Sequence, residues 1–110
     1  IANNGTLTLT NCTLSDNSAT GASGGGILNF STLDNIATLT LTNCTLSGNS
    51  AANGGGIYND FGRATLTNCT LSGNSTWMGF RGGTLTLRNG DSRLYQTRQS
   101  CRGLRDWRVW

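Results

Sequence analysis

The sequence has 110 residues, which leaves room for one small domain, and no apolar run in it approaches the length of a transmembrane span. It is rich in glycine, with 16 residues, and contains neither proline nor histidine. The formal net charge of +3 averages two unlike segments, because residues 1–80 hold one Arg and three Asp whereas residues 81–110 hold seven Arg and two Asp. The chain opens at Ile1 without a signal peptide, so we expect a segment of a longer protein.

A repeated motif dominates the chain as far as residue 89. Residues 6–18 read TLTLTNCTLSDNS, residues 38–50 read TLTLTNCTLSGNS, and residues 65–75 read TLTNCTLSGNS. A second block follows as GGGILNF at 24–30 and GGGIYND at 54–60, and TLTLRN at 84–89 begins a further copy. Repeats of this length are typical of solenoids, in which each repeat contacts only its neighbours.

The cysteine spacing gives the length of one turn. Cys44 and Cys69 are 25 residues apart, whereas Cys12 and Cys44 are 32 apart, so the first turn carries seven extra residues. Two of these fall within residues 19–23 and five between residues 29 and 38. A solenoid tolerates such insertions in its loops, because the stacked strands keep their register.

Within one turn the apolar pattern has a period of two. Leucines alternate with threonines over residues 38–42, which predicts a strand with one buried face. Asn43 shifts the phase, residues 47–50 form a second turn, and residues 57–59 follow Gly54–Gly56 as a third strand. The sequence therefore predicts an all-β parallel β-helix of about 3.5 triangular coils over residues 1–89, divided as 6–37, 38–63, 64–83 and a partial 84–89.

Stacking at about 4.8 Å should place like residues over like residues. The expected inward columns are Leu7, Leu39, Leu66 and Leu85; Cys12, Cys44 and Cys69; and Ile27 with Ile57. The bend is expected to carry an asparagine ladder made of Asn11, Asn43 and Asn68. The cysteine spacings match no zinc pattern, and stacked parallel neighbours suit a disulfide poorly. We expect buried thiols that pack as small apolar groups.

No catalytic, cofactor-binding or metal-binding residue emerges from the sequence. Asp16, Asp34 and Asp60 occupy different repeat positions, so they should not meet as the paired carboxylates of a glycosidase. The glycine triplets lack the Lys-Ser/Thr of a phosphate-binding loop and are expected to form tight bends where rungs crowd. The Asn-x-Ser/Thr sequons at Asn11, Asn43 and Asn68 are expected at a packed bend, where a glycan would obstruct stacking. They are therefore interpreted as the asparagine ladder and not as glycan acceptors.

Threonines define one candidate surface. Those expected to project from a single flat face are Thr6, Thr8, Thr10, Thr38, Thr40, Thr42, Thr65, Thr67, Thr84 and Thr86. Their hydroxyls would repeat at about 4.8 Å across rungs and about 6.7 Å along a strand. This array resembles the ice-binding face of antifreeze β-helices, although threonine is also favoured at any exposed strand position.

Residues 90–110 leave the repeat and form an Arg- and Trp-rich tail. Apolar side chains recur every third residue at Cys101, Leu104, Trp107 and Trp110, as on a short amphipathic helix. Such a helix would cap the last rung. An incidental tail without a role is the equal alternative.

The motif pair LSGNSA and GGGIYN resembles the repeats of chlamydial polymorphic outer-membrane proteins and related bacterial surface β-helices. Leucine stands at Leu46 where those repeats have Phe, and Gly56 replaces their Ala. The resemblance covers residues 6–75 and implies a right-handed helix in an exported protein, often an adhesin or autotransporter passenger at the cell surface or outer membrane. It transfers no catalytic residue.

We therefore expect a non-enzymatic structural or adhesive module that needs no cofactor. Its expected partners are a host or environmental glycan or protein surface and further β-helix coils of the parent protein, and no nucleic acid. The alternatives are a fragment of a β-helix polysaccharide lyase or hydrolase, and an ice-binding protein acting through the Thr-x-Thr face.

Overall fold

The computed structural model describes residues 1–75, 78–88 and 106–109, and within these ranges the regular structure is entirely β. No helix in these ranges has the length and apolar character needed to cross a bilayer. The strands are β1 (Ala2–Asn3), β2 (Thr6–Thr10), β3 (Thr13–Ser15), β4 (Ser18–Ser23), β5 (Ile27–Phe30), β6 (Thr38–Thr42), β7 (Thr45–Ser47), β8 (Ser50–Asn53), β9 (Ile57–Asp60), β10 (Arg63–Thr67), β11 (Thr70–Ser72), β12 (Met78–Arg81), β13 (Thr84–Arg88) and β14 (Asp106–Val109).

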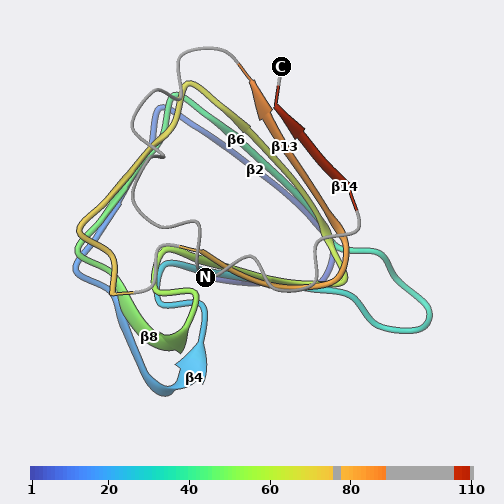
Figure 1. Ribbon diagram of the computed structural model, residues 1–110, viewed down its shortest axis with the longest axis horizontal. Coiled ribbons are helices and arrows are strands. Elements are labelled where there is room, and N and C mark those ends of the chain that lie inside the picture. Colours follow the sequence, from blue (N-terminus) through green and yellow to red (C-terminus); the bar gives the residue numbers. More distant parts are fainter. Residues whose placement is uncertain (76–77, 89–105, 110) are drawn as a thin grey trace.

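The strands wind into a triangular coil whose rungs lie one behind another (Figure 1). Strands β6, β7, β8 and β9 make one complete turn, and β10 begins the next directly over β6. In Figure 1 the chain runs counterclockwise as successive rungs approach the viewer, so the coil is right-handed. This confirms the predicted parallel β-helix, and its hand is that of nearly all parallel crossovers.

Four parallel sheets make the walls of the coil. Sheet A has the order β1-β5-β9-β12, sheet B the order β14-β13-β10-β6-β2, sheet C the order β11-β7-β3, and sheet D is the pair β4-β8. Sheets A, B and C are the three sides of the triangle, and sheet D projects beyond the corner between C and A (Figure 1). The sequence pattern predicted three strands per turn and missed β8, because Ser50–Asn53 has two small alanines between polar residues and no apolar–polar alternation.

The extra residues of the first turn lie where the sequence placed them. In sheet D, Ala19 pairs with Ala51 and Ser23 with Asn53, so β4 accommodates two more residues than β8. Phe30 pairs with Asp60 and Thr38 with Arg63, so the other five residues form the loop that projects between β5 and β6. Neither insertion alters the register of sheets A, B and C.

Most corners bend through the left-handed backbone region, which residues other than Gly, Asn and Asp rarely enter. Between sheets B and C the bend residues are Asn11, Asn43 and Asn68, with φ of 55°, 53° and 51°. At the corner that leads into sheet A, Gly24 and Gly54 have φ of 74° and 57°, and a Cβ on either would collide with backbone atoms of its own bend. The glycine triplets are therefore bend residues, as the sequence predicted.

The core is a narrow apolar column along the coil axis. Alternate residues of β6 and β7 face inward, so Leu39, Leu41 and Leu46 are fully buried, and Ile27 and Ile57 face them from sheet A. Because the same positions of every rung face inward, the apolar column continues from one rung to the next.

One predicted column is wrong. Leu66 pairs with Leu41 and Leu87 in the column that begins at Leu9, whereas Ala64 pairs with Leu39 and Leu85 in the column that begins at Leu7. The third repeat starts one threonine–leucine pair later, so Leu66 corresponds to the second leucine of the earlier strands and not to the first. Ile27 and Ile57 pair directly, as expected.

The prediction of a helical cap in the tail is also wrong for the part that can be described. Residues 106–109 form strand β14, which pairs in parallel with β13 and adds a fifth strand to sheet B. Trp107, placed on an amphipathic helix by its spacing, therefore lies on a strand opposite Leu85. Cys101, Leu104 and Trp110 lie outside the described residues.

Candidate functional site

The predicted threonine surface is the outer face of sheet B. Thr8, Thr40, Thr65 and Thr86 are aligned across four rungs and form one uninterrupted row. The rows on either side contain the remaining predicted threonines, but Arg63 takes a threonine position in one and Arg88 in the other. Across β2, β6, β10 and β13 the outer face is thus a regular hydroxyl grid with two exposed guanidinium groups near its borders. In β14, Asp106 and Arg108 pair with Thr84 and Thr86.

A second hydroxyl surface lies on sheet C and was not predicted. Thr45 pairs with Thr13 and Thr70, and Ser47 pairs with Ser15 and Ser72, while the leucine between them faces the core. Two of the three sides of the coil therefore present rows of hydroxyl groups.

The cysteines form the expected inward column. Cys44 and Cys69 are 1% and 3% exposed, whereas Cys12, in the first rung, is only partly buried. Each thiol donates to the carbonyl oxygen two residues earlier in the chain, at 3.3 Å, which fixes its orientation. The column follows the bend after sheet B and packs as part of the core.

The predicted asparagine ladder forms, but in a different environment from the one expected. Asn43 donates from Nδ2 to Asn11 Oδ1 at 3.1 Å, and Asn68 donates to Asn43 Oδ1 at 3.4 Å. All three side chains are exposed on the outside of the bend, so the expectation of a packed bend there is wrong. The left-handed backbone turns the amide outward, where it links the rungs from the solvent side.

Two inner asparagine ladders were missed. Asn3, Asn29 and Asn59 are buried in one row on the inner face of sheet A. Successive members are joined by Nδ2-to-Oδ1 hydrogen bonds of 2.7 and 2.6 Å. The second ladder lies at the bend between sheets C and D, where Asn17 donates to Asn49 and Asn49 to Asn74 at 2.8 and 3.0 Å. Asn49 also donates to Leu14 O and accepts from the backbone of Asn17. The amides thus satisfy backbone groups that the bends leave unpaired.

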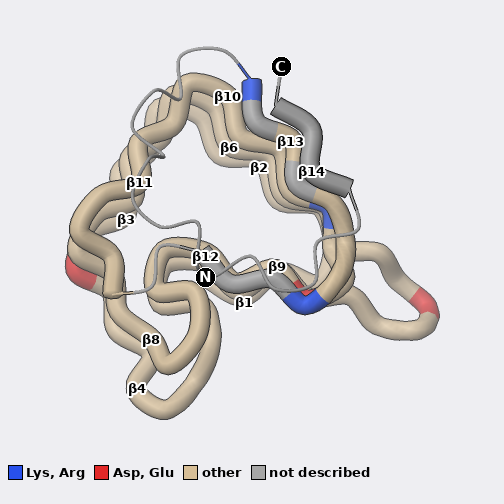
Figure 2. The backbone as a smooth tube through the Cα atoms, in the orientation of Figure 1, with Lys and Arg blue, Asp and Glu red and all other residues tan. Residues whose placement is uncertain are grey.

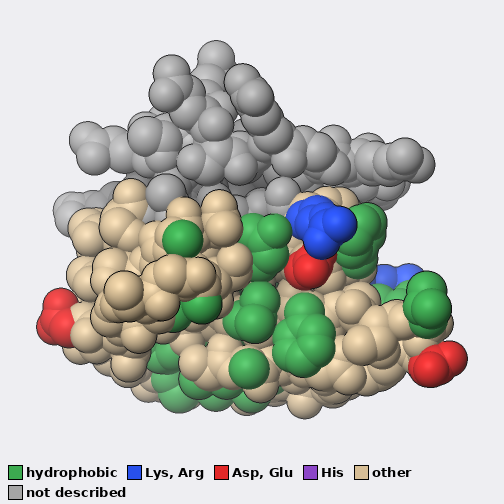
Figure 3. Space-filling model, turned by 90° about the horizontal axis from the view of Figure 1, so that it is seen from below, with side chains coloured by type: hydrophobic (Ala, Val, Ile, Leu, Met, Phe, Trp, Pro, Cys, Tyr) green, Lys and Arg blue, Asp and Glu red, His purple; other side chains and the backbone are tan. Residues whose placement is uncertain are grey.

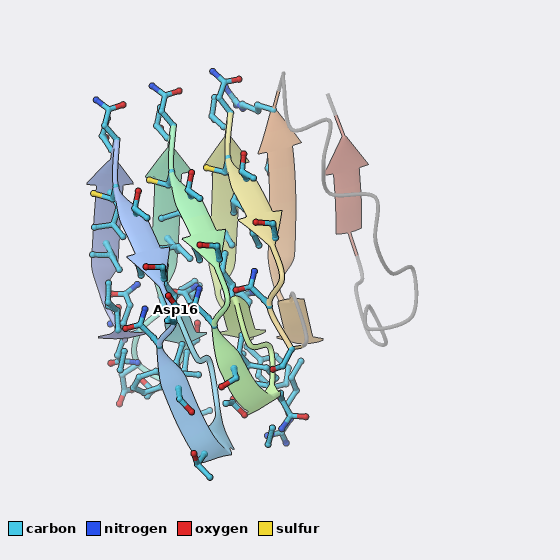
Figure 4. All side chains as sticks on the ribbon, turned by 90° about the vertical axis from the view of Figure 1, so that its left-hand side faces the viewer. Asp16 is labelled. Atoms are coloured by element: carbon cyan, nitrogen blue, oxygen red, sulfur yellow. The ribbon has the colours of Figure 1, made fainter. Side chains whose placement is uncertain are left out.

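The carboxylates lie on different parts of the molecule. Asp16 is at the bend between sheets C and D, where its side chain lies over Gly48 of the next rung (Figure 4). Asp34 is at the tip of the loop between β5 and β6, and Asp60 ends β9 in sheet A. No group of three metal-ligating side chains occurs among the described residues. Asp16, Asp34 and Asp60 therefore do not form the pair of carboxylates that a glycosidase mechanism requires.

Sheet A has the least polar outer face. Leu28 is paired with Tyr58, and Phe30 with Asp60, so aromatic and aliphatic side chains alternate with the buried asparagine ladder. Figure 3 views this side, where apolar side chains surround one acidic and one basic residue. Asp60 Oδ1 is buried and has no hydrogen-bond partner among the described residues.

At the corner where sheet A turns into sheet B, the charged groups lie close to one another along the backbone. Figure 2 shows basic residues on both sides of this corner and an acidic residue on the projecting loop. Asp60 pairs with Arg81 in the sheet, and the Arg81 guanidinium lies over the ring of Phe61, 5.7 Å from its centroid. Arg63 begins sheet B two residues after Phe61 and is exposed.

The sequence matches no protein-family profile, and neither a curated protein nor a solved structure matches the chain. The class of the protein therefore follows from the fold alone, which is a parallel β-helix with repeated hydroxyl surfaces.

Proposed function

We propose that the chain is a non-enzymatic structural and adhesive repeat module of an exported bacterial surface protein. The non-enzymatic role is supported by the hydrogen-bonding side chains inside the coil, because these side chains link one rung to the next. Asn29, Asn49 and Asn59 are fully buried, and each is hydrogen-bonded to an amide in an adjacent rung. What is left to interact with other molecules is the outer surface, which repeats with the coil.

The observation that carries the proposal is the unbroken hydroxyl row of Thr8, Thr40, Thr65 and Thr86 on sheet B. A regular row of uncharged donors and acceptors can bind an extended polymer at many equivalent points. Weak contacts gain strength when several are made at once, as multivalent binding requires. The partner class we propose is a glycan or protein surface in the host or environment.

The test is binding of the purified chain to an array of glycans and matrix proteins. Replacing Thr8, Thr40 and Thr65 by Val keeps the shape and β-propensity of the row and removes its hydroxyls. The matched control replaces Ser15, Ser47 and Ser72 on sheet C by Ala. We expect the sheet B variant to lose binding and the control to retain it. Equal loss in both variants, or turnover of a polysaccharide by the unaltered chain, would contradict the proposal.

The same row favours a second candidate function, which is binding to ice. The threonines of this row and of the two rows beside it repeat at about 4.8 Å across rungs and about 6.7 Å along a strand. Thermal hysteresis of the folded chain is the measurement, and Thr40→Val in the middle of the row should abolish it. A folded sample without thermal hysteresis would exclude this function.

A further inference from the structure

Exposed apolar side chains gather at one edge of the coil. In the described part of the chain the exposed large hydrophobic residues are Ile1, Leu33, Ile36 and Phe61. The last three lie where sheet A turns into sheet B, with exposures of 105%, 56% and 56%. We refer to Leu33, Ile36 and Phe61 as the edge patch. A gathering of this type on a small, mostly polar surface marks an interaction site.

Phe61 occupies a backbone conformation that a phenylalanine rarely adopts. Its φ is 54°, and the residue aligned with it in the next rung is Gly82, with φ of 69°. Every other non-glycine residue with positive φ in the described part is Asn or Asp. Holding a bulky residue there costs about 1–2 kcal/mol, and such strain is characteristic of functional positions. Glycine would suit the bend better, so the backbone conformation does not account for the aromatic side chain.

Ile36 and Phe61 occupy the same coil position on successive rungs. The amide of Arg63 donates to Ala37 O at 2.8 Å, which places Phe61 in register with Ile36. Ile36 and Phe61 therefore follow one another along this corner on successive rungs.

Leu33 lies at the tip of a small, well-anchored hairpin. The amides of Thr32 and Asn35 each donate to the other residue's carbonyl oxygen, at 2.9 and 3.4 Å. Asn35 Nδ2 donates to Asn4 O, and Ser31 Oγ accepts from the amide of Ala37, so the base of the loop is tied to the coil. The loop thus projects Leu33 and Asp34 outward in a fixed direction.

The charges around the patch are of both signs. Asp34 is next to Leu33 at the hairpin tip, and Arg63 is next to the Phe61 corner, one rung further along the coil. Neither makes an ion pair with any residue that the structure describes, and both are exposed. Arg81 differs, because its guanidinium lies on the Phe61 ring. The surface therefore carries an acid at one end and an available base at the other.

We propose that the edge patch binds a second copy of this chain in an isologous, two-fold contact. A two-fold axis perpendicular to the coil axis sets two coils side by side and antiparallel. The hairpin of each copy then faces the following rung of the other, so that Leu33 packs on Phe61 and Asp34 faces Arg63, twice. A surface patch that meets itself must be self-complementary in this way. The small apolar area makes this a weak, transient association.

Sedimentation velocity over a range of concentrations is the test. The unaltered chain is expected to show a mass that rises from monomer toward dimer with concentration. Phe61→Gly should weaken association by about tenfold or more, because a buried aromatic anchor is lost. Since glycine suits this backbone, the variant should remain folded, which the circular dichroism spectrum and thermal midpoint check. Leu33→Ser is a second variant, on the opposite side of the contact. Because Leu33 is exposed, this substitution should not affect folding.

A charge exchange distinguishes this contact from general stickiness. Asp34→Arg and Arg63→Asp should each remain monomeric alone, because like charges would then face each other. An equimolar mixture of the two variants should form a heterodimer, since both contacts become Arg–Asp pairs. Arg88→Asp, an identical change at the far end of sheet B, is the control and should associate like the unaltered chain. A strictly monomeric unaltered chain, or variants that stay apart when mixed, would overturn the proposal, whatever the chain binds through its hydroxyl rows.

Discussion

Asn29 donates from Nδ2 to Asn59 Oδ1 at 2.6 Å, and both side chains are completely buried behind sheet A. Asn3 donates in turn to Asn29 Oδ1 at 2.7 Å, so the middle amide is bonded to the rung on each side. The ladder runs through the wall of the coil, at the point where the chain bends from sheet A toward sheet B. It is one of two asparagine ladders in an interior that is otherwise mostly apolar.

Asn29→Ala is expected to lower the free energy of unfolding by about 3 kcal/mol, because it removes three hydrogen bonds and leaves Asn59 Oδ1 buried without its donor. Urea denaturation gives the value. The control is Asn43→Gly, which keeps the left-handed backbone and removes an exposed link. Its effect should stay below about 1 kcal/mol. Equal losses in the two variants would show that the inner ladder has no special role.

Phe61→Gly should leave the thermal midpoint unchanged or raise it by a few degrees. Relief of an unfavourable φ offsets the loss of a half-exposed ring. Gly82→Ala tests the same corner in the opposite sense, because a Cβ there would lie 2.7 Å from the Phe61 ring and the φ of 69° disfavours it. That variant should melt several degrees lower. A large drop for Phe61→Gly would mean that the ring is needed for folding.

Asp60→Asn is expected to be neutral or to stabilise the fold by up to about 1 kcal/mol. One carboxylate oxygen of Asp60 is buried without a partner among the described residues, and a neutral amide is less costly to bury. Asp34→Asn, at the exposed hairpin tip, is the matched control and should not change the urea midpoint. Marked destabilisation by Asp60→Asn would indicate that its charge is stabilising.

The cysteine column predicts graded thiol reactivity in a Cys101→Ser background. Cys12 is partly exposed in the first rung and should react with a thiol reagent in the native state. Cys44 and Cys69, at 1% and 3% exposure, should react only when the coil opens. The kinetics of labelling, followed by peptide mapping, separate the three. Similar rates at Cys12 and Cys44 would contradict a closed core.

The sequence was sufficient to predict the fold class, because the repeat is visible in the order of the residues. The spacing of Cys44 and Cys69 predicted the coil, and the alternation of leucine and threonine predicted which side of sheet B faces outward. The misplaced Leu66 was also recoverable, because it precedes Cys69 by three residues just as Leu41 precedes Cys44. Counting back from the cysteine gives the observed pairing.

The features that were missed depend on burial and on contacts between distant residues. Asn49 and Asn59 recur at fixed positions, but a polar residue beside a turn reads as exposed unless its partners are known. Strand β14 has no counterpart in the repeat, and its pairing with β13 follows only from the path of the chain. The edge patch joins a loop insertion to a bend in the next rung, a proximity that only the coil creates.

Because successive turns carry identical residues at many identical positions, the number of turns can change by recombination within the gene. A recombination event that duplicates or removes the coding sequence for one 25-residue turn leaves every column, ladder and bend matched at the new junction. Copies that differ only in number of turns would fold equally well. Natural variants should therefore vary in length by whole turns more readily than they vary at Asn29 or Leu41, and each added turn would lengthen the hydroxyl row by one step.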